Sequence, residues 1–183
     1  MVFEDYYNYD FSTLDRRDLK SYAEYFVAEK DARLQKFIDK IVFDYSINQS
    51  DLDFSEKSLE MMDRWLVNHV ECVRLTKEEY ELVRNTVPDY IDINDWKFSE
   101  DTLSGIINVG LYLGEVMIRK HPELKWEQCL KKTIDYGQMI IRIGKSTMNP
   151  MRLVYVTCLK IVDAHKTPRS LLEILRVWEN YLL

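Results

Sequence analysis

The most apolar stretch of the chain, "GIINVGLYLGEVMIRKHPELKW" (residues 105–126), decides the fold. Two of its glycines, Gly110 and Gly114, lie four residues apart and share one helical face. A glycine inside a helix costs about 1 kcal/mol relative to alanine, and close approach of a neighbouring helix is the usual compensation. The stretch therefore predicts a central helix with a packing seam at Gly110 and Gly114.

Polar residues within this stretch argue against a membrane helix. A span needs about 20 apolar residues, and Asn108, Glu115 and Arg119 interrupt the run. Glu115 lies beside the glycine face and four residues before Arg119, a spacing that favours an exposed ion pair. The alternative is a buried, functional Glu115 that is hydrogen-bonded to Tyr112 or to another tyrosine.

Helical periodicity and capping residues recur along the rest of the chain. Apolar residues at steps of three and four predict a first helix from about Thr13 to Asp44. Residue types that commonly begin helices predict five more. These predicted starts are Ser55, Thr76 (with Glu79 as a capping box), Ser99, Asn149 (before Pro150) and Thr167 (before Pro168).

Between residues 126 and 147 the helical spacing is lost. The segment "QMIIRIG" is rich in β-branched residues and lies between Gly137 and Gly144, which is typical of a strand. We therefore expect a mainly α fold: a compact bundle of about six helices with a short β-hairpin or strand element around residues 126–147. A single domain over residues 1–183 is expected, with residues 1–12 as a flexible acidic and aromatic N-terminal arm.

The net charge of −6 is unevenly distributed. Residues 1–124 hold 26 acids and 15 bases, whereas residues 125–183 hold 5 acids and 10 bases. The overall acidity disfavours a nucleic-acid role, because phosphate binding relies on clustered Lys and Arg. The asymmetry indicates either two parts that pack together and neutralise each other or a charged surface for a partner.

Cysteine and motif content bear on compartment and chemistry. Cys72, Cys129 and Cys158 are odd in number and form no CxxC pair, which predicts reduced thiols in a cytoplasmic protein. The acidic N-terminal sequence lacks the basic start and apolar core of a secretory signal. No metal-ligand spacing, P-loop, GxSxG or GxGxxG motif is present, so we expect no metal or cofactor and favour a non-enzymatic role.

Two segments interleave aromatic and acidic residues: "FEDYYNYDF" (3–11) and "DYIDINDWKFSED" (89–101). Such composition suits recognition of a basic protein surface, because rings supply buried anchors and carboxylates steer the encounter. The alternative is that the rings cover the ends of the core while the acids are solvated. The candidate partner-binding residues are Asp89, Tyr90, Asp92, Asp95 and Trp96.

Seven segments together carry a resemblance to a known family. Collectively they resemble a family of small, mostly helical and uncharacterised bacterial proteins, in which a proline is expected at the position of Met139. The resemblance spans nearly the whole chain and so implies one domain, and it implies no particular activity. The segments are "DLKSYAEYFVAEKDARLQKFI" (18–38), "SEKSLEMMDRWL" (55–66), "IDINDWKFSEDTLSGIINVGLYLGEV" (91–116), "HPELKWEQ" (121–128), "IDYGQMII" (134–141), "NPMRLVYV" (149–156) and "LLEILRVWENYL" (171–182).

Three functional hypotheses follow from these observations. The first is a protein-interaction module that binds a basic protein, for which an immunity-type antitoxin that occludes a cationic toxin is a concrete form. The second is a small-molecule-binding or enzymatic domain with a pocket lined by Tyr112, Glu115, Trp126 and Tyr136. The third is a homo-oligomeric structural protein, in which the acidic part of one copy meets the basic part of another.

Overall fold

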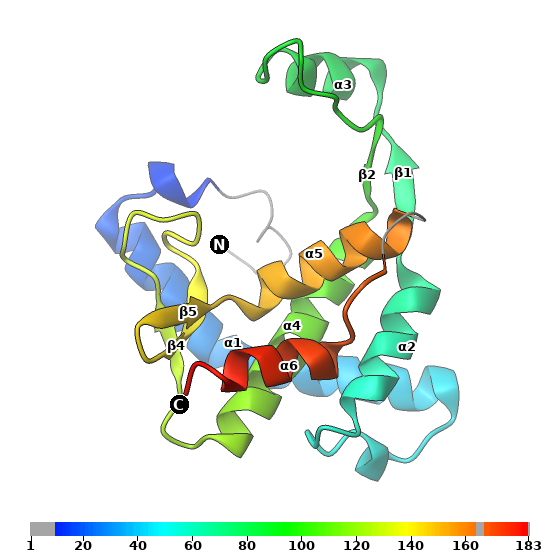
Figure 1. Cartoon of the computed structure of the whole chain (residues 1–183), viewed down its shortest axis with the longest axis vertical. Helices are drawn as coiled ribbons and strands as arrows, with labels where there is room; N and C mark the ends of the chain where they lie inside the picture. The colour runs from blue at the N-terminus through cyan, green and yellow to red at the C-terminus, as the bar shows by residue number, and fades with distance from the viewer. Residues whose placement is uncertain (1–9, 164–166, 183) are drawn as a thin grey trace.

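The computed structural model describes residues 10–163 and 167–182, and these residues are mainly helical (Figure 1). The mainly α prediction is confirmed, with six α-helices in the described residues. Of the predicted flexible arm, residues 1–9 lie outside the described residues, while residues 10–12 belong to a capped turn in which Phe11 is buried. The helices are α1 (Arg16–Tyr45), α2 (Leu59–His69), α3 (Lys77–Arg84), α4 (Glu100–Lys120), α5 (Pro150–Val162) and α6 (Leu171–Glu179), with 3-10 turns η2 (Phe11–Thr13) and η3 (Gln49–Asp51).

Helix α4, which contains the opening stretch, forms the centre of the body. It begins at Ser99, whose hydroxyl accepts a hydrogen bond from the Thr102 amide at 3.1 Å. Of residues 105–117, all but Asn108 are buried. A helix that is apolar around its whole circumference must be covered on every side. Helices α1, α2, α5 and α6 provide that cover. Within the described residues, no helix is both long enough and apolar enough to cross a membrane.

The glycines of α4 allow three different neighbours to approach closely. A β-carbon at Gly110 would lie 2.7 Å from the Met151 Cα, so the predicted helix contact is confirmed there and the neighbour is α5. At Gly114 the predicted helix contact is wrong, because the neighbour is the indole ring of Trp126, 2.2 Å from an added β-carbon. A third glycine, Gly105, accommodates the ring of Trp65 from α2.

Two small antiparallel sheets complete the fold. The first pairs β1 (Cys72–Arg74) with β2 (Trp96–Phe98), and the second has the order β3 (Trp126–Gln128), β4 (Met139–Ile143), β5 (Ser146–Met148). The prediction of one β element around residues 126–147 is therefore incomplete. Strands of three residues are too short to show a period of two, so the sequence pattern did not reveal the β1–β2 pair.

The predicted helix starts are partly confirmed. Asn149 and Thr76 cap α5 and α3 through their side chains. Ser55 is not the cap of α2, because it belongs to a turn that precedes the helix. In that turn the Ser58 hydroxyl donates a hydrogen bond to the Ser55 carbonyl at 2.7 Å, and the Ser58 amide donates to the Ser55 hydroxyl. Thr167 is not the cap of α6, because Ser170 forms a reciprocal capping box with the residue three positions later.

The segment from β1 to β2 stands away from the body in Figure 1. Its two strands run side by side out of the helical body, and α3 lies at the far end. We call residues 72–98 the projection. The expected compact bundle therefore describes the body of the molecule and not this segment.

Candidate functional site

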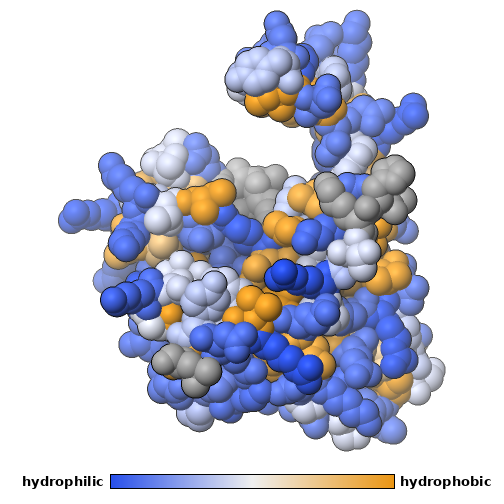
Figure 2. All heavy atoms as spheres, viewed as in Figure 1, coloured by the Kyte–Doolittle hydropathy of each residue, from blue (hydrophilic) through white to orange (hydrophobic). Residues whose placement is uncertain are grey.

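The projection has almost no core of its own. No residue of α3 is buried, and Phe98, at the base, is the single buried residue of the whole segment. The described residues include fourteen exposed large apolar side chains, and six of them lie here, although the projection holds only 27 of the 170 described residues (10–163 and 167–182). In Figure 2 the outlying part of the molecule shows a group of apolar residues among hydrophilic ones. The six are Val73, Tyr80, Leu82, Val83, Tyr90 and Ile91.

Local polar contacts hold the projection in shape. The Thr76 hydroxyl accepts from the Glu79 amide at 3.2 Å, and the Glu79 carboxylate accepts from the Thr76 amide at 2.9 Å. The same carboxylate pairs with Lys97 of β2, which ties α3 to the strands and holds the pKa of Glu79 below its ordinary value. The Leu75 amide donates to the Asp95 carbonyl at 2.9 Å and closes the base of the loop.

Arg84 organises the loop that follows α3. Its guanidinium donates to the carbonyl of Ile91 at 2.8 Å, to that of Val87 at 3.1 Å and to that of Pro88. Three backbone acceptors on one side chain fix the path of residues 87–91. Tyr90 lies in the middle of this loop with 86% of its surface exposed. The loop therefore holds an aromatic ring in solvent on a defined backbone.

Of the five predicted partner-binding residues, Asp89 and Tyr90 lie on this loop, and Asp92 and Asp95 follow it before β2. Asp89, Tyr90, Asp92 and Asp95 are all exposed. Trp96 lies apart from them in β2, half-buried and packed edge-on against the ring of Phe98 at 5.5 Å. The contact of Trp96 therefore fits the alternative interpretation, in which the ring covers the end of the core.

The sequence did not single out the apolar residues of α3 and β1 as candidates. Leu82 and Val83 belong to a helix with a well-formed capping box and an apolar side, which ordinarily indicates packing against a core. No local pattern could have singled them out, because whether the apolar side of this short helix meets a core depends on where the helix lies in the tertiary structure.

Glu115, the residue in question in the opening stretch, is buried and contacts Trp126 and Lys30. The Trp126 indole Nε1 donates to its Oε1 at 2.9 Å, and the Lys30 ammonium lies 3.0 Å from the same oxygen. Burial lowers the pKa of Lys30, but Asp31 and Glu115 together raise it above its ordinary value. The expected surface pair with Arg119 is wrong, since that guanidinium lies 3.5 Å from the centroid of the Phe54 ring.

The other predicted pocket residues make separate contacts. The Tyr112 hydroxyl donates to the Ser58 hydroxyl at 2.6 Å and accepts from the Phe54 amide at 3.0 Å, and burial raises the pKa of Tyr112. Tyr136 lies half-buried between β3 and β4. The structure thus joins Glu115 to Trp126 and leaves the two tyrosines out of that cluster. The expected hydrogen bond between Glu115 and Tyr112 is not formed.

In the residues that the structure describes, no three His, Cys, Asp or Glu side chains are grouped so that they could hold a metal ion. The three cysteines are free, with Cys129 and Cys158 buried and Cys72 exposed. Comparison of the chain with protein-family models, with curated proteins and with solved structures gave no match. The resemblance to a family of small bacterial proteins therefore stays a prediction.

Proposed function

We propose that this protein is a protein-interaction module that binds a basic partner protein through the projection. The observation that carries the proposal is a folded segment that exposes six large apolar side chains and buries one residue. Exposed apolar surface of this kind is characteristic of protein–protein contact sites, because water is a poor environment for it. Among the described residues, the body packs against the segment only at its base, where Phe98 joins the core beside Tyr155 of α5.

The charges of the projection suit a basic partner. Residues 72–98 hold six acids and four bases, and Asp89 and Asp92 lie one and two positions from the exposed Tyr90 in the sequence. Carboxylates around an aromatic anchor accelerate the approach of a positive surface and disfavour a negative one. Because Arg84 already fixes residues 87–91, little conformational entropy is lost on binding. An immunity-type antitoxin that occludes a cationic toxin is one concrete form of such a module.

A matched pair of alanine variants tests the anchor. Tyr90→Ala removes a ring that is 86% exposed, and Phe43→Ala removes one on α1 that is 84% exposed. The wild-type protein is used to capture a partner, and both variants are then titrated with that partner by calorimetry. We expect Tyr90→Ala to weaken binding at least tenfold, about 1.4 kcal/mol or more, and Phe43→Ala to leave it unchanged.

Shortening the projection tests its role as a whole. Arg74 and Trp96 are paired across the β1–β2 ladder, so residues 75–95 can be replaced by Asn-Gly, which suits a tight hairpin turn. The shortened protein should keep its melting temperature and lose the partner. Capture of a protein that is acidic, or that binds the shortened chain equally well, contradicts the proposal, and so does the absence of any partner.

A further inference from the structure

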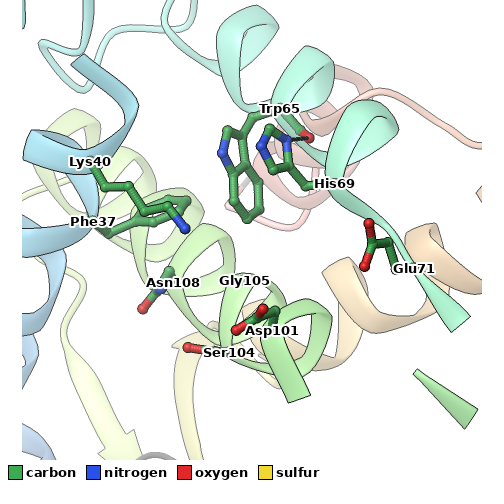
Figure 3. A pocket seen from close by; sticks show the side chains of 9 residues that line it. All are labelled: Phe37, Lys40, Trp65, His69, Glu71, Asp101, Ser104, Gly105 and Asn108. Atoms are coloured by element: carbon green, nitrogen blue, oxygen red, sulfur yellow. Dashed lines mark hydrogen bonds between the residues drawn. The ribbon is translucent and has the colours of Figure 1, made fainter. Parts of the chain in front are cut away.

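A cavity of about 220 Å³ lies in the body, where α1, α2 and α4 meet near the base of the projection. It is smaller than the roughly 300–1,000 Å³ of pockets for drug-sized ligands, so its size suits a small metabolite. It lies away from the Glu115 cluster and from the exposed loop around Tyr90. Its walls mix one aromatic face with side chains of both charges, as Figure 3 shows.

Trp65 is the unusual member of the wall. The residue is only 5% exposed, and its indole Nε1 has no hydrogen-bond partner in the structure. A buried N–H without an acceptor is costly, and such groups in native proteins usually have a specific reason. The ring reaches its position because Gly105 lacks a β-carbon, which would lie 2.6 Å from the indole. In Figure 3 the indole nitrogen faces the side of the cavity from which Lys40 enters.

His69 holds the Trp65 ring from the other face. The two rings are stacked, with centroids 4.5 Å apart and planes 9° apart. The His69 Nδ1 lies 2.9 Å from the Trp65 carbonyl oxygen, and because that oxygen can only accept, Nδ1 carries the proton. Phe37 closes the opposite side with an edge contact at 4.9 Å, which supplies no oxygen or nitrogen acceptor. The indole N–H is therefore held firmly and left without an acceptor.

The charged side chains of the wall are separated by sign. Lys40 enters from α1, while Asp101 lies on α4 and Glu71 lies just beyond the end of α2 (Figure 3). In the part of the chain that the structure describes, none of these three side chains forms an ion pair. The cavity thus has a donor end, formed by Lys40 and the Trp65 indole, and an acidic end formed by Asp101 and Glu71.

We propose that this cavity binds a small zwitterion of the free amino acid class. The ligand carboxylate accepts from the Trp65 Nε1–H and pairs with the Lys40 ammonium. The ligand ammonium is held by Asp101 and Glu71. A simple anion such as phosphate meets two unfavourable carboxylates, and a simple cation leaves the Trp65 N–H without an acceptor. Only a ligand with both charges satisfies both ends.

Nuclear magnetic resonance of the indole N–H groups gives a direct test. The Trp65 signal is assigned by its absence in Trp65→Phe, and the full chain is titrated with each standard amino acid at millimolar concentration. At least one amino acid should shift the Trp65 signal saturably. Its deaminated acid and its decarboxylated amine, which carry one charge each, should bind at least tenfold more weakly.

Two surface variants keep the test independent of folding. Lys40→Met and Asp101→Asn change exposed side chains, so each protein should fold. Each variant should bind the amino acid at least tenfold more weakly than the wild type does. Trp178→Phe is the control and should leave the titration unchanged. The proposal is overturned if no amino acid shifts the Trp65 signal, or if both variants bind as the wild type does. Neither result bears on the projection, because partner capture is measured separately.

Discussion

Helices α4 and α3 begin in the same way and differ in how much of their surface is buried. Each starts after a hydroxyl residue, Ser99 or Thr76, whose side chain accepts from the amide three positions on. Nearly every residue of α4 from 105 to 117 is buried, whereas α3 has no buried residue. Local capping thus decides where a helix begins. The tertiary structure decides whether the apolar side of the helix is buried in the body, as in α4, or exposed to solvent, as in α3.

The largest expected difference between the two helices is the response to losing one leucine. Leu111 of α4 is fully buried, and Leu111→Ala should lower the free energy of unfolding by about 2–5 kcal/mol, because it leaves a cavity. Leu82 of α3 is 69% exposed, and Leu82→Ala should change it by less than about 0.5 kcal/mol. Urea unfolding measures both. Equal losses would mean that α3 packs against the body in solution.

A smaller effect is expected where α4 meets α5. In Gly110→Ala the new methyl lies 2.7 Å from the Met151 Cα, and backbone cannot rotate away as a side chain can. We expect a loss of about 1–3 kcal/mol despite the better helix propensity of alanine. The control is Glu78→Ala on the exposed face of α3, which should be nearly neutral. A gain of stability in Gly110→Ala would show that the two helices are not tightly spaced.

Ion pairs extend the comparison. Glu115 and Lys30 have side chains only 12% and 16% exposed, while Glu81 and Lys77 of α3 are 61% and 83% exposed. Glu115→Gln should cost about 1–2 kcal/mol, because Lys30 loses a partner in a mostly dry site. Glu81→Gln should cost about 0–0.5 kcal/mol. A double-mutant cycle with Lys30→Met isolates the pair energy, and a coupling near zero would refute the difference.

The smallest expected effect is a pH dependence of stability that arises where α2 contacts the first residue of α6. Both Asp63 carboxylate oxygens accept from the Leu171 amide, at 3.0 and 3.1 Å, and burial raises the Asp63 pKa to about 6. The folded state therefore binds the Asp63 proton more tightly than the unfolded state, whose pKa is near 3.8. The free energy of unfolding falls as pH rises from about 4 to about 6, and it is flat above that.

Asp63→Asn keeps an acceptor for the Leu171 amide and removes this titration. Relative to the wild type, the variant should gain on the order of 1 kcal/mol between pH 4 and pH 7, a value discounted for the partial exposure of the carboxyl. Urea unfolding at several pH values checks it. Parallel pH profiles for the two proteins would show that Asp63 keeps an ordinary pKa.

The sequence predicted well what depends on neighbours along the chain. The helix starts at Thr76, Ser99 and Asn149 are correct because each cap bonds to an amide three residues later. Composition alone also marked the acidic and aromatic segment that contains Asp89 and Tyr90, and its role as a binding site stays a prediction. The predicted neighbour of Gly114 was wrong, because a glycine in a helix indicates that another group approaches closely and does not indicate which group it is.

The sequence by itself determined a mainly helical chain, a buried central helix without a membrane span and an acidic aromatic loop. Only the tertiary structure decided that Glu115 faces Lys30 and Trp126, that Trp65 lines a cavity beside Lys40, and that residues 72–98 project from the body. The physical reason is the range of the interactions. Caps and periodicity act over three or four residues, whereas Glu115 and Lys30 are 85 positions apart and meet only when the helices pack.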